Sequence, residues 1–251
     1  MPSWRSISAS VAGTSHVARG LPCQDSHAVK TLESGDLVIA VADGCGSSKR
    51  SDEGSRSAVE VSTQFIAERL QREHPATAEE CTALLESALR EASTALQQLA
   101  LPESDVNEVA TTLLLTLVTD QWLATAQIGD GAIVCRSRTG ELTVVSNSPR
   151  GEYVNETTYL TSPTYESHVH KTTLPSSDVT GIAMFTDGVE FLALRYLDNT
   201  AHEPFFSTMF DFALNPTSTP EDLQQFLASD RVCERTDDDK TLVLAVRHEP
   251  D

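Results

Sequence analysis

The feature that most constrains the fold is an apolar run, residues 37–42, that ends in Asp43-Gly44 and is followed by a second glycine, Gly46. A continuous apolar run of this length predicts a strand covered on both faces. The carboxylate of Asp43 is then expected at the rim of a sheet, and Gly44 and Gly46 let the backbone pass close to whatever it binds. A single Asp-Gly after a strand is also an ordinary hairpin-turn signal, so this instance alone does not separate a site from a turn.

The pattern recurs along the chain. Residues 124–128 lead through Gly129 into Asp130-Gly131, and residues 182–185 lead through Thr186 into Asp187-Gly188. The order then inverts, because the acidic cluster Asp237-Asp238-Asp239 stands directly before an apolar-rich run, residues 241–246. A further acid, Asp25, closes residues 22–25 ahead of the first central strand.

If these strands are antiparallel neighbours, carboxylates at the ends of some and at the start of another lie along one edge. Such a group of like charges cannot remain ionised together without a cation. Ligands that are all oxygen suit Mg²⁺ or Mn²⁺ rather than zinc, which prefers nitrogen and sulfur. The sequence therefore predicts a site for a hard divalent metal.

In order and spacing, these blocks resemble the signature of the metal-dependent protein phosphatases of type 2C, in their bacterial branch. The resemblance extends from about residue 7 to residue 246. The blocks that carry it are Gly13–His16 with Gly20–Asp25, Ala42-Asp43-Gly44-x-Gly46, Gly129-Asp130-Gly131, Gly151–Thr157, Thr186-Asp187-Gly188 and Asp238-Asp239-x-Thr241.

The resemblance implies two metal ions about 4 Å apart that share a water, whose pKa falls towards neutrality so that hydroxide can attack phosphorus in line. It implies Asp43 as the bridging ligand, the Gly44 carbonyl as an additional ligand, and Asp187 and Asp238 as the ligands that complete the second metal. Asp130 matches a position that helps to hold a third, weaker metal in bacterial relatives. The acid that usually assists it is replaced by Phe191, so only part of that third site is present.

Three further residues are candidates for catalysis. Asp25 is expected to hydrogen-bond to metal-bound waters without binding a metal itself. In the family a glutamate usually precedes this Asp, and here Gln24 takes its place, with one negative charge fewer. Arg19 and His16 are candidates to receive the phosphate or to protonate the leaving alcohol. Arg19 stands one position from the register expected of the family's arginine, and either residue could equally be an ordinary polar group of a loop.

The order of predicted elements favours an α+β fold. Strands are expected at 5–11, 37–42, 111–118, 122–128, 132–137, 142–146, 181–186 and 241–247. Helices are expected at 55–71, 78–100 with a capping box of Thr77 and Glu80, 189–196, 204–214 and 221–229. Residues 13–22 are expected to be a loop, and residues 148–177 an irregular flap with short strands. This pattern indicates packed antiparallel sheets covered by helices, in agreement with the four-layer α-β-β-α sandwich that the resemblance implies.

Composition narrows the function classes further. Hydrophobic residues make up 39% and charged residues 22%, as in a soluble globular protein, and we expect residues 1–251 to form a single phosphatase domain. Because 37 acidic residues stand against 18 basic ones, the net charge of −19 disfavours nucleic acid as a partner. Five cysteines without a Cys-x-x-Cys pair argue against a disulfide framework and a structural zinc site. No apolar run approaches a membrane span and no signal-peptide core is visible, so we expect a cytoplasmic monomer.

These observations predict a serine/threonine protein phosphatase that depends on Mn²⁺ or Mg²⁺, acts on phosphorylated proteins and is linked to a Ser/Thr kinase. One alternative is a non-catalytic module that keeps the fold and binds phosphorylated partners, which the departures at Gln24 and Phe191 would suit. Another is an enzyme of the same fold that acts on a small phosphorylated molecule. Retention of four acid-block positions together, Asp43, Gly44, Asp187 and Asp238, favours the enzyme over the binding module.

Overall fold

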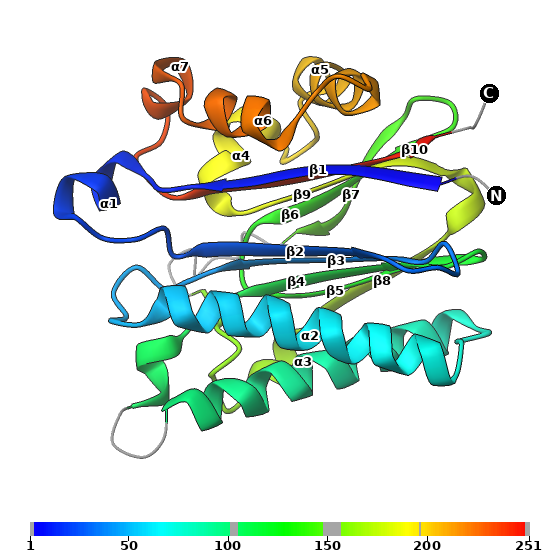
Figure 1. Ribbon diagram of the computed structural model, residues 1–251, viewed down its shortest axis with the longest axis horizontal. Coiled ribbons are helices and arrows are strands. Elements are labelled where there is room, and N and C mark those ends of the chain that lie inside the picture. Colours follow the sequence, from blue (N-terminus) through cyan, green and yellow to red (C-terminus); the bar gives the residue numbers. More distant parts are fainter. Residues whose placement is uncertain (1–2, 101–104, 148–156, 196, 249–251) are drawn as a thin grey trace.

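Two five-stranded antiparallel sheets face each other in the computed structural model, which describes residues 3–100, 105–147, 157–195 and 197–248 (Figure 1). The first sheet contains, in spatial order, β1 (Ser3–Val11), β10 (Lys240–His248), β9 (Val179–Phe185), β6 (Ala132–Ser137) and β7 (Leu142–Asn147). The second contains β2 (Asp25–Thr31), β3 (Leu37–Asp43), β4 (Leu113–Val118), β5 (Trp122–Ile128) and β8 (His170–Pro175).

Helices cover the outer face of each sheet, which gives the four layers seen in Figure 1. The two longest, α2 (Ser51–Arg72) and α3 (Ala78–Ala100), pack on the second sheet. The first sheet is covered by α4 (Asp187–Ala193), α5 (Glu203–Leu214) and α6 (Pro220–Leu227), which α7 (Asp230–Cys233) follows. The predicted α-β-β-α sandwich is thus confirmed.

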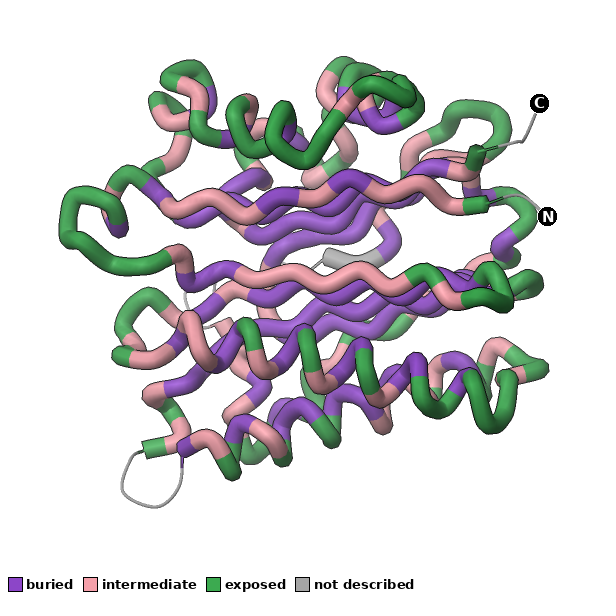
Figure 2. The backbone as a smooth tube through the Cα atoms, viewed as in Figure 1, coloured by how far each residue is buried: buried purple, intermediate pink, exposed green. Residues whose placement is uncertain are grey.

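Strand β3 shows how alternation of side chains builds these layers. Leu37, Ile39 and Val41 point into the core between the two sheets, where they meet residues of β9 and β10 such as Met184 and Val243. The intervening residues 38, 40 and 42 point the other way, into the core shared with α2 and α3. Both faces are fully buried, as predicted from the unbroken apolar run, and Figure 2 shows the same burial along the central strands.

Several predicted elements are confirmed and others need correction. Helix α3 has the predicted bounds, and the Glu80 N–H donates to Thr77 Oγ1 at 3.2 Å as the capping box requires. The stretch expected to be a loop before Pro22 instead contains a short helix, α1 (Thr14–Arg19). Strand β2 was not predicted, because it lies at a sheet edge and its half-buried residues lack a clear apolar alternation.

The region expected to form a flap, residues 148–177, is described only in part. Residues 148–156 lie outside the described residues. Beyond them come three short elements, η2 (Tyr165–His168), β8 and η3 (Ser176–Asp178), of which β8 pairs with β5 along its length. A further 3₁₀ helix, η1 (Val106–Val109), precedes β4. Within the described ranges, no helix is both long enough and apolar enough to cross a membrane.

Leu114→Ala is expected to lower the free energy of unfolding by about 2–5 kcal/mol, because Leu114 is fully buried between the sheets and its truncation leaves a cavity. Leu197→Ala, at a side chain that is 95% exposed, is the matched control and should change stability by less than about 0.5 kcal/mol. Urea unfolding followed by circular dichroism measures both. Equal stabilities of the two variants would contradict the packing described.

Candidate active site

The site begins with a pair of acids on adjacent strands. In the antiparallel register of β2 and β3, Asp25 stands directly opposite Asp43, so both side chains emerge on the same face of the sheet. That face is the one carrying Val41, which points between the sheets. The two carboxylates therefore lie at the end of the intersheet core and face the first sheet.

The backbone of Asp43 is held by two threonines just before β4. The Asp43 N–H donates to Thr112 Oγ1 at 2.9 Å, and the Asp43 carbonyl accepts from the Thr112 N–H at 2.8 Å and from Thr111 Oγ1 at 2.9 Å. Sequence analysis placed Thr111 and Thr112 in a buried strand and gave them no role. Nothing in their local pattern distinguishes them, because their partner is almost 70 residues away.

Gly44 continues from Asp43 through a passage that only glycine fits. Its N–H donates to the Gln24 carbonyl at 3.1 Å, and it forms an isolated bridge with Thr111. A β-carbon here would lie 2.7 Å from the carbonyl oxygens of both Gln24 and Ser51, a severe overlap. The predicted close approach of backbone at Gly44 is thus present, next to the Asp43 carboxylate.

Asp187 comes from the other sheet, at the first position of α4, directly after β9 and Thr186. Thr186 links the two sheets: its Oγ1 donates to Asp25 Oδ2 at 2.7 Å and accepts the Thr241 N–H at 3.0 Å. Thr186 was noted only as part of the Asp-Gly pattern, and its contact with Asp25 was not predicted.

The acidic triplet before β10 divides into residues with different contacts. Asp238 is exposed, and its Oδ1 accepts the Asp239 N–H at 2.8 Å. Asp239 is 2% exposed, and its carboxylate accepts the N–H groups of Gly13 and Gln24 at 2.6 Å each. The adjacent Lys240 is fully buried and donates to the Asp238 carbonyl at 3.0 Å. Sequence analysis singled out Asp238 and missed the separate role of Asp239.

Asp130 lies in the turn between β5 and β6, flanked by Gly129 and Gly131, whose φ angles of 90° and 85° favour glycine. Its Oδ2 accepts a hydrogen bond from Thr157 Oγ1 at 2.7 Å. Thr157 belongs to the segment predicted as a flap, so the described end of that segment reaches this acid.

Mutual repulsion shows that the predicted acids share one neighbourhood. Burial, followed by the charges of Asp25, Asp187, Asp130 and Asp238, raises the pKa of Asp43 well above its ordinary value. Burial and the charges of Asp130 and Asp238 likewise raise the pKa of Asp187 to about 7. The fold therefore brings together acids that lie up to about 200 residues apart in the sequence.

Burial is also the main cause that raises the pKa of Asp25, with the charges of Asp239 and Asp187 adding to it. The Thr186 and Thr241 hydrogen bonds oppose this shift. A positive charge placed beside this carboxyl would favour its ionised form.

The donor set suits a hard divalent cation. Three buried oxygens in this region, Asp25 Oδ1, Asp187 Oδ1 and Gln24 Oε1, have no hydrogen-bond partner among the described residues, which leaves them available to a metal ion or its waters. Within the same residues, no three side chains of His, Cys, Asp or Glu already form a closed cage around one point.

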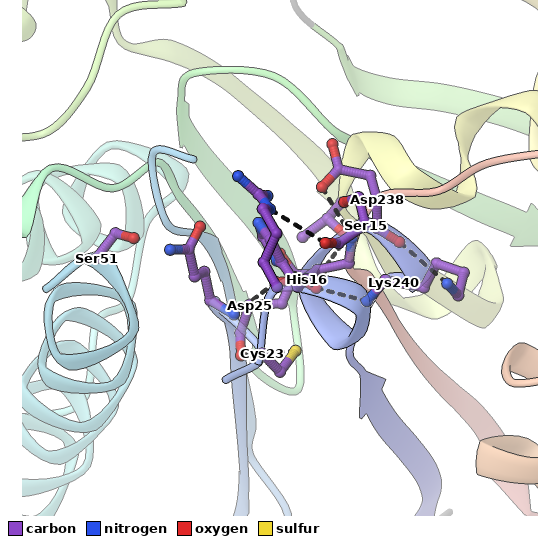
Figure 3. A network of polar contacts seen from close by, with 12 residues as sticks. Ser15, His16, Cys23, Asp25, Ser51, Asp238 and Lys240 are labelled. Atoms are coloured by element: carbon purple, nitrogen blue, oxygen red, sulfur yellow. Dashed lines mark hydrogen bonds and ion pairs between the residues drawn. The ribbon is translucent and has the colours of Figure 1, made fainter. Parts of the chain in front are cut away.

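The two proposed phosphate-side residues, His16 and Arg19, lie on α1. His16 is 4% exposed, and its Nδ1 is 2.8 Å from Asp239 Oδ1, an ion-pair distance without the alignment of a good hydrogen bond. Figure 3 shows His16 in this polar network, with Asp25 and Asp238. Arg19 is exposed, its Nε–H donates to the Ser15 carbonyl at 3.1 Å, and it forms no ion pair with a described carboxylate. The structure thus joins His16 to the acids and leaves Arg19 at the surface.

Comparison with known proteins agrees with this arrangement. The sequence matches the family described as protein phosphatase 2C over residues 12–228, which is most of the chain. The chain therefore belongs to the protein phosphatase 2C family and is a phosphoprotein phosphatase. The match ends before the acidic triplet, whose membership in the site comes from its contacts and charges described above.

Individual relatives point the same way. The chain is 34% identical over 253 residues to serine/threonine-protein phosphatase 3 of Escherichia coli (strain K12), covering 97% of this chain and 98% of that protein. Its fold is similar to that of a bacterial serine phosphatase, with 13% identity, a TM-score of 0.66 and 98% of each chain covered. It is also similar in fold to RsbX in complex with magnesium, with 16% identity, a TM-score of 0.57, and 98% and 96% of the two chains covered.

Thr186→Val is expected to lower the free energy of unfolding by about 1–3 kcal/mol, because it removes the hydrogen bond from Thr186 Oγ1 to Asp25 Oδ2 and the one that Thr186 Oγ1 accepts from the Thr241 N–H. Thr208→Val is a matched control, since that exposed hydroxyl donates to the Pro204 carbonyl of its own helix. Chemical unfolding of the metal-free proteins compares the two. Equal effects would show that the link between the sheets contributes nothing specific.

Asp187→Asn is expected to stabilise the metal-free protein at about pH 8 by about 1–3 kcal/mol. With its pKa raised to about 7, the Asp187 carboxyl stabilises the fold when protonated. That contribution is present below the unfolded value of 3.8 and is lost as the pH rises to about 7. Urea unfolding in EDTA at about pH 5 and about pH 8 should show a larger advantage of the variant at the higher pH. A variant less stable than wild type at the higher pH would contradict the repulsion described.

Proposed function

We propose that this chain is a Mg²⁺- or Mn²⁺-dependent serine/threonine protein phosphatase that hydrolyses phosphoserine and phosphothreonine in proteins. The observation that carries the proposal is the convergence of acids from both sheets into one partly buried cluster whose members raise each other's pKa. Membership of the protein phosphatase 2C family and the name of the Escherichia coli relative support the same reaction.

We assign the acids by their positions. Asp43, the Gly44 carbonyl, Asp187 and Asp238 would hold two ions, and Asp130, which Thr157 already occupies on one oxygen, would assist at a third position at most. Asp25 would orient bound waters through Oδ1, because Thr186 holds its other oxygen. When bound, the ions would lower the pKa of a water and neutralise charge on the phosphoryl oxygens.

The remaining residues prepare the site. Thr111 and Thr112 fix the Asp43 backbone, and the buried Gln24 backbone anchors both Gly44 and Asp239. His16 would protonate the leaving alcohol, and Arg19 is the candidate cation for the phosphate, which its long side chain would have to reach from the surface. Because the ligands come from segments at the edges of both sheets rather than from one loop, their geometry depends on how the two sheets pack.

The finer assignments extend the proposal. The whole chain would act as one catalytic domain, as a monomer in the cytoplasm, on proteins phosphorylated by a Ser/Thr kinase. The strongly acidic surface, with a net charge of −19, favours substrates whose phosphoresidue is not surrounded by acids. The magnesium named for RsbX supports Mg²⁺ as one of the ions, with Mn²⁺ as the alternative.

Asp43→Asn and Asp187→Asn are each expected to reduce hydrolysis of a phosphothreonine peptide by at least about 100-fold, because each removes a charged metal ligand. EDTA should abolish the wild-type activity, and added Mn²⁺ should restore it. Phosphate release measures the rates, and calorimetric titration with Mn²⁺ measures binding.

Asp198→Asn is a suitable control, since Asp198 is exposed and its carboxylate accepts hydrogen bonds from Thr200 in its own turn. It should retain wild-type rates. Full activity in either ligand variant would overturn the mechanism, and failure of the wild-type protein to bind Mn²⁺ at millimolar concentration would favour a non-catalytic module instead.

A further inference from the structure

One buried carboxylate, that of Asp239, closes the loop that carries α1. Asp239 Oδ1 accepts the N–H of Gly13, before α1, and Asp239 Oδ2 accepts the N–H of Gln24, after it, both at 2.6 Å. The acidic triplet at residues 237–239 makes a third hydrogen bond to this loop, from the Ser15 N–H to the Asp237 carbonyl at 3.0 Å. Residues 13–24 are therefore fastened at both ends to the segment that contains the proposed metal ligand Asp238.

The packing at Gly13 shows how tight this attachment is. A β-carbon on Gly13 would lie 2.3 Å from the Asp237 carbonyl oxygen and 2.5 Å from that of Asp238. No side chain fits between the loop and the triplet. Close packing and hydrogen bonds therefore hold the loop directly against the backbone segment that contains Asp238.

The third group at this carboxylate is the imidazole of His16. Its Nδ1 lies 2.8 Å from Asp239 Oδ1, and the two side chains are 5% and 2% exposed. A carboxylate at this distance favours a proton on Nδ1, so that in the imidazolium form the second proton is carried by Nε2. Within the described part of the chain no hydrogen bond occupies Nε2, so this nitrogen is free to act on a substrate.

The location of the pair relates it to the reaction. The charge of Asp239 acts directly on Asp25, whose pKa it helps to raise, so the pair borders the acid cluster. The close view shows the labelled His16 in one network with Asp25 and Asp238 (Figure 3). Asp239 itself has its carboxylate fully used by Gly13, Gln24 and His16, which leaves it unsuited to be a metal ligand.

We propose that Asp239 is a positioning residue, which holds the His16 imidazole so that Nε2–H protonates the leaving oxygen of phosphoserine or phosphothreonine. This inference rests on the proposed function. It divides the triplet: Asp238 contributes to metal binding, Asp239 orients the acid, and Asp237 provides only a backbone carbonyl.

The step balances without any further reactant. The oxygen of the attacking water forms a bond to phosphorus and gives up one proton to solvent, as the bond from phosphorus to the serine or threonine oxygen breaks. The electron pair of the broken bond stays on that oxygen, which takes the proton from His16 Nε2. Asp239 stabilises the imidazolium before transfer, and the neutral imidazole then regains a proton from solvent.

The test uses two substrates that differ in their need for a proton. A phosphothreonine peptide leaves as an alkoxide and needs an acid, whereas p-nitrophenyl phosphate leaves as a stable anion and does not. His16→Gln and Asp239→Asn should each lower kcat on the peptide by about 100-fold and on p-nitrophenyl phosphate by less than about threefold. The double variant should be no slower on the peptide than His16→Gln alone, because Asp239 acts through His16.

Asp237→Asn is the matched control, with the same change of charge in the same triplet at an exposed side chain. It should leave both rates within about twofold of wild type. Calorimetric titration with Mn²⁺ should give similar affinities for all three single variants, which separates the positioning role from metal binding.

Equal losses on both substrates, or a large loss of Mn²⁺ affinity in Asp239→Asn, would show that Asp239 only maintains the structure and would overturn the proposal. If Asp239→Asn fails to fold, His16→Gln still tests the proposal. Equal losses of activity on the two substrates in that variant would show that His16 is not the general acid, and Asp239 would then have no acid to orient. Wild-type protein that hydrolyses neither substrate would instead overturn the proposed function, and this inference with it.

Discussion

Repulsion between carboxylates that two sheets hold against each other is the constraint on which this structure depends. Asp25 and Asp43 come from one sheet and Asp187 and Asp238 from the segments around the other, and burial raises the pKa of the first three. The intersheet core of aliphatic side chains keeps the two groups together against this repulsion. A site of this kind reduces the stability of the metal-free fold, and binding of a divalent cation would restore it.

The sequence was sufficient to predict the layers and most of the acids, because both depend on local patterns. The apolar run ending at Asp43 predicts a strand buried on both faces and a carboxylate at its rim, and both are observed. Strand β2 escaped prediction because an edge strand needs no apolar alternation. Thr186 and Asp239 escaped for another reason: their partners, Asp25 and Gly13, are 161 and 226 residues away. Only the tertiary fold shows which hydroxyl or carboxylate faces which acid.

The triplet at 237–239 shows how neighbouring identical residues acquire different functions. The chain bends at Asp238, which remains exposed beside the acid cluster, while Asp239 is buried in the protein. There it meets the backbone of a segment from the opposite end of the chain. From composition alone, Asp237, Asp238 and Asp239 would be three equivalent negative charges. Their environments make one of them an internal anchor, and the chain thereby connects its N-terminal loop to its last strand at the site.

The pairing of β2 with β3 has a consequence for evolution and for design. Because side chains alternate, displacing either strand by a single position would turn its acid from the intersheet face towards the helix-covered face of the sheet. An insertion of one residue within either strand is therefore expected to remove its acid from the site. The catalytic alignment is therefore protected by the same forces that specify the core, and variation in this chain should accumulate in its turns.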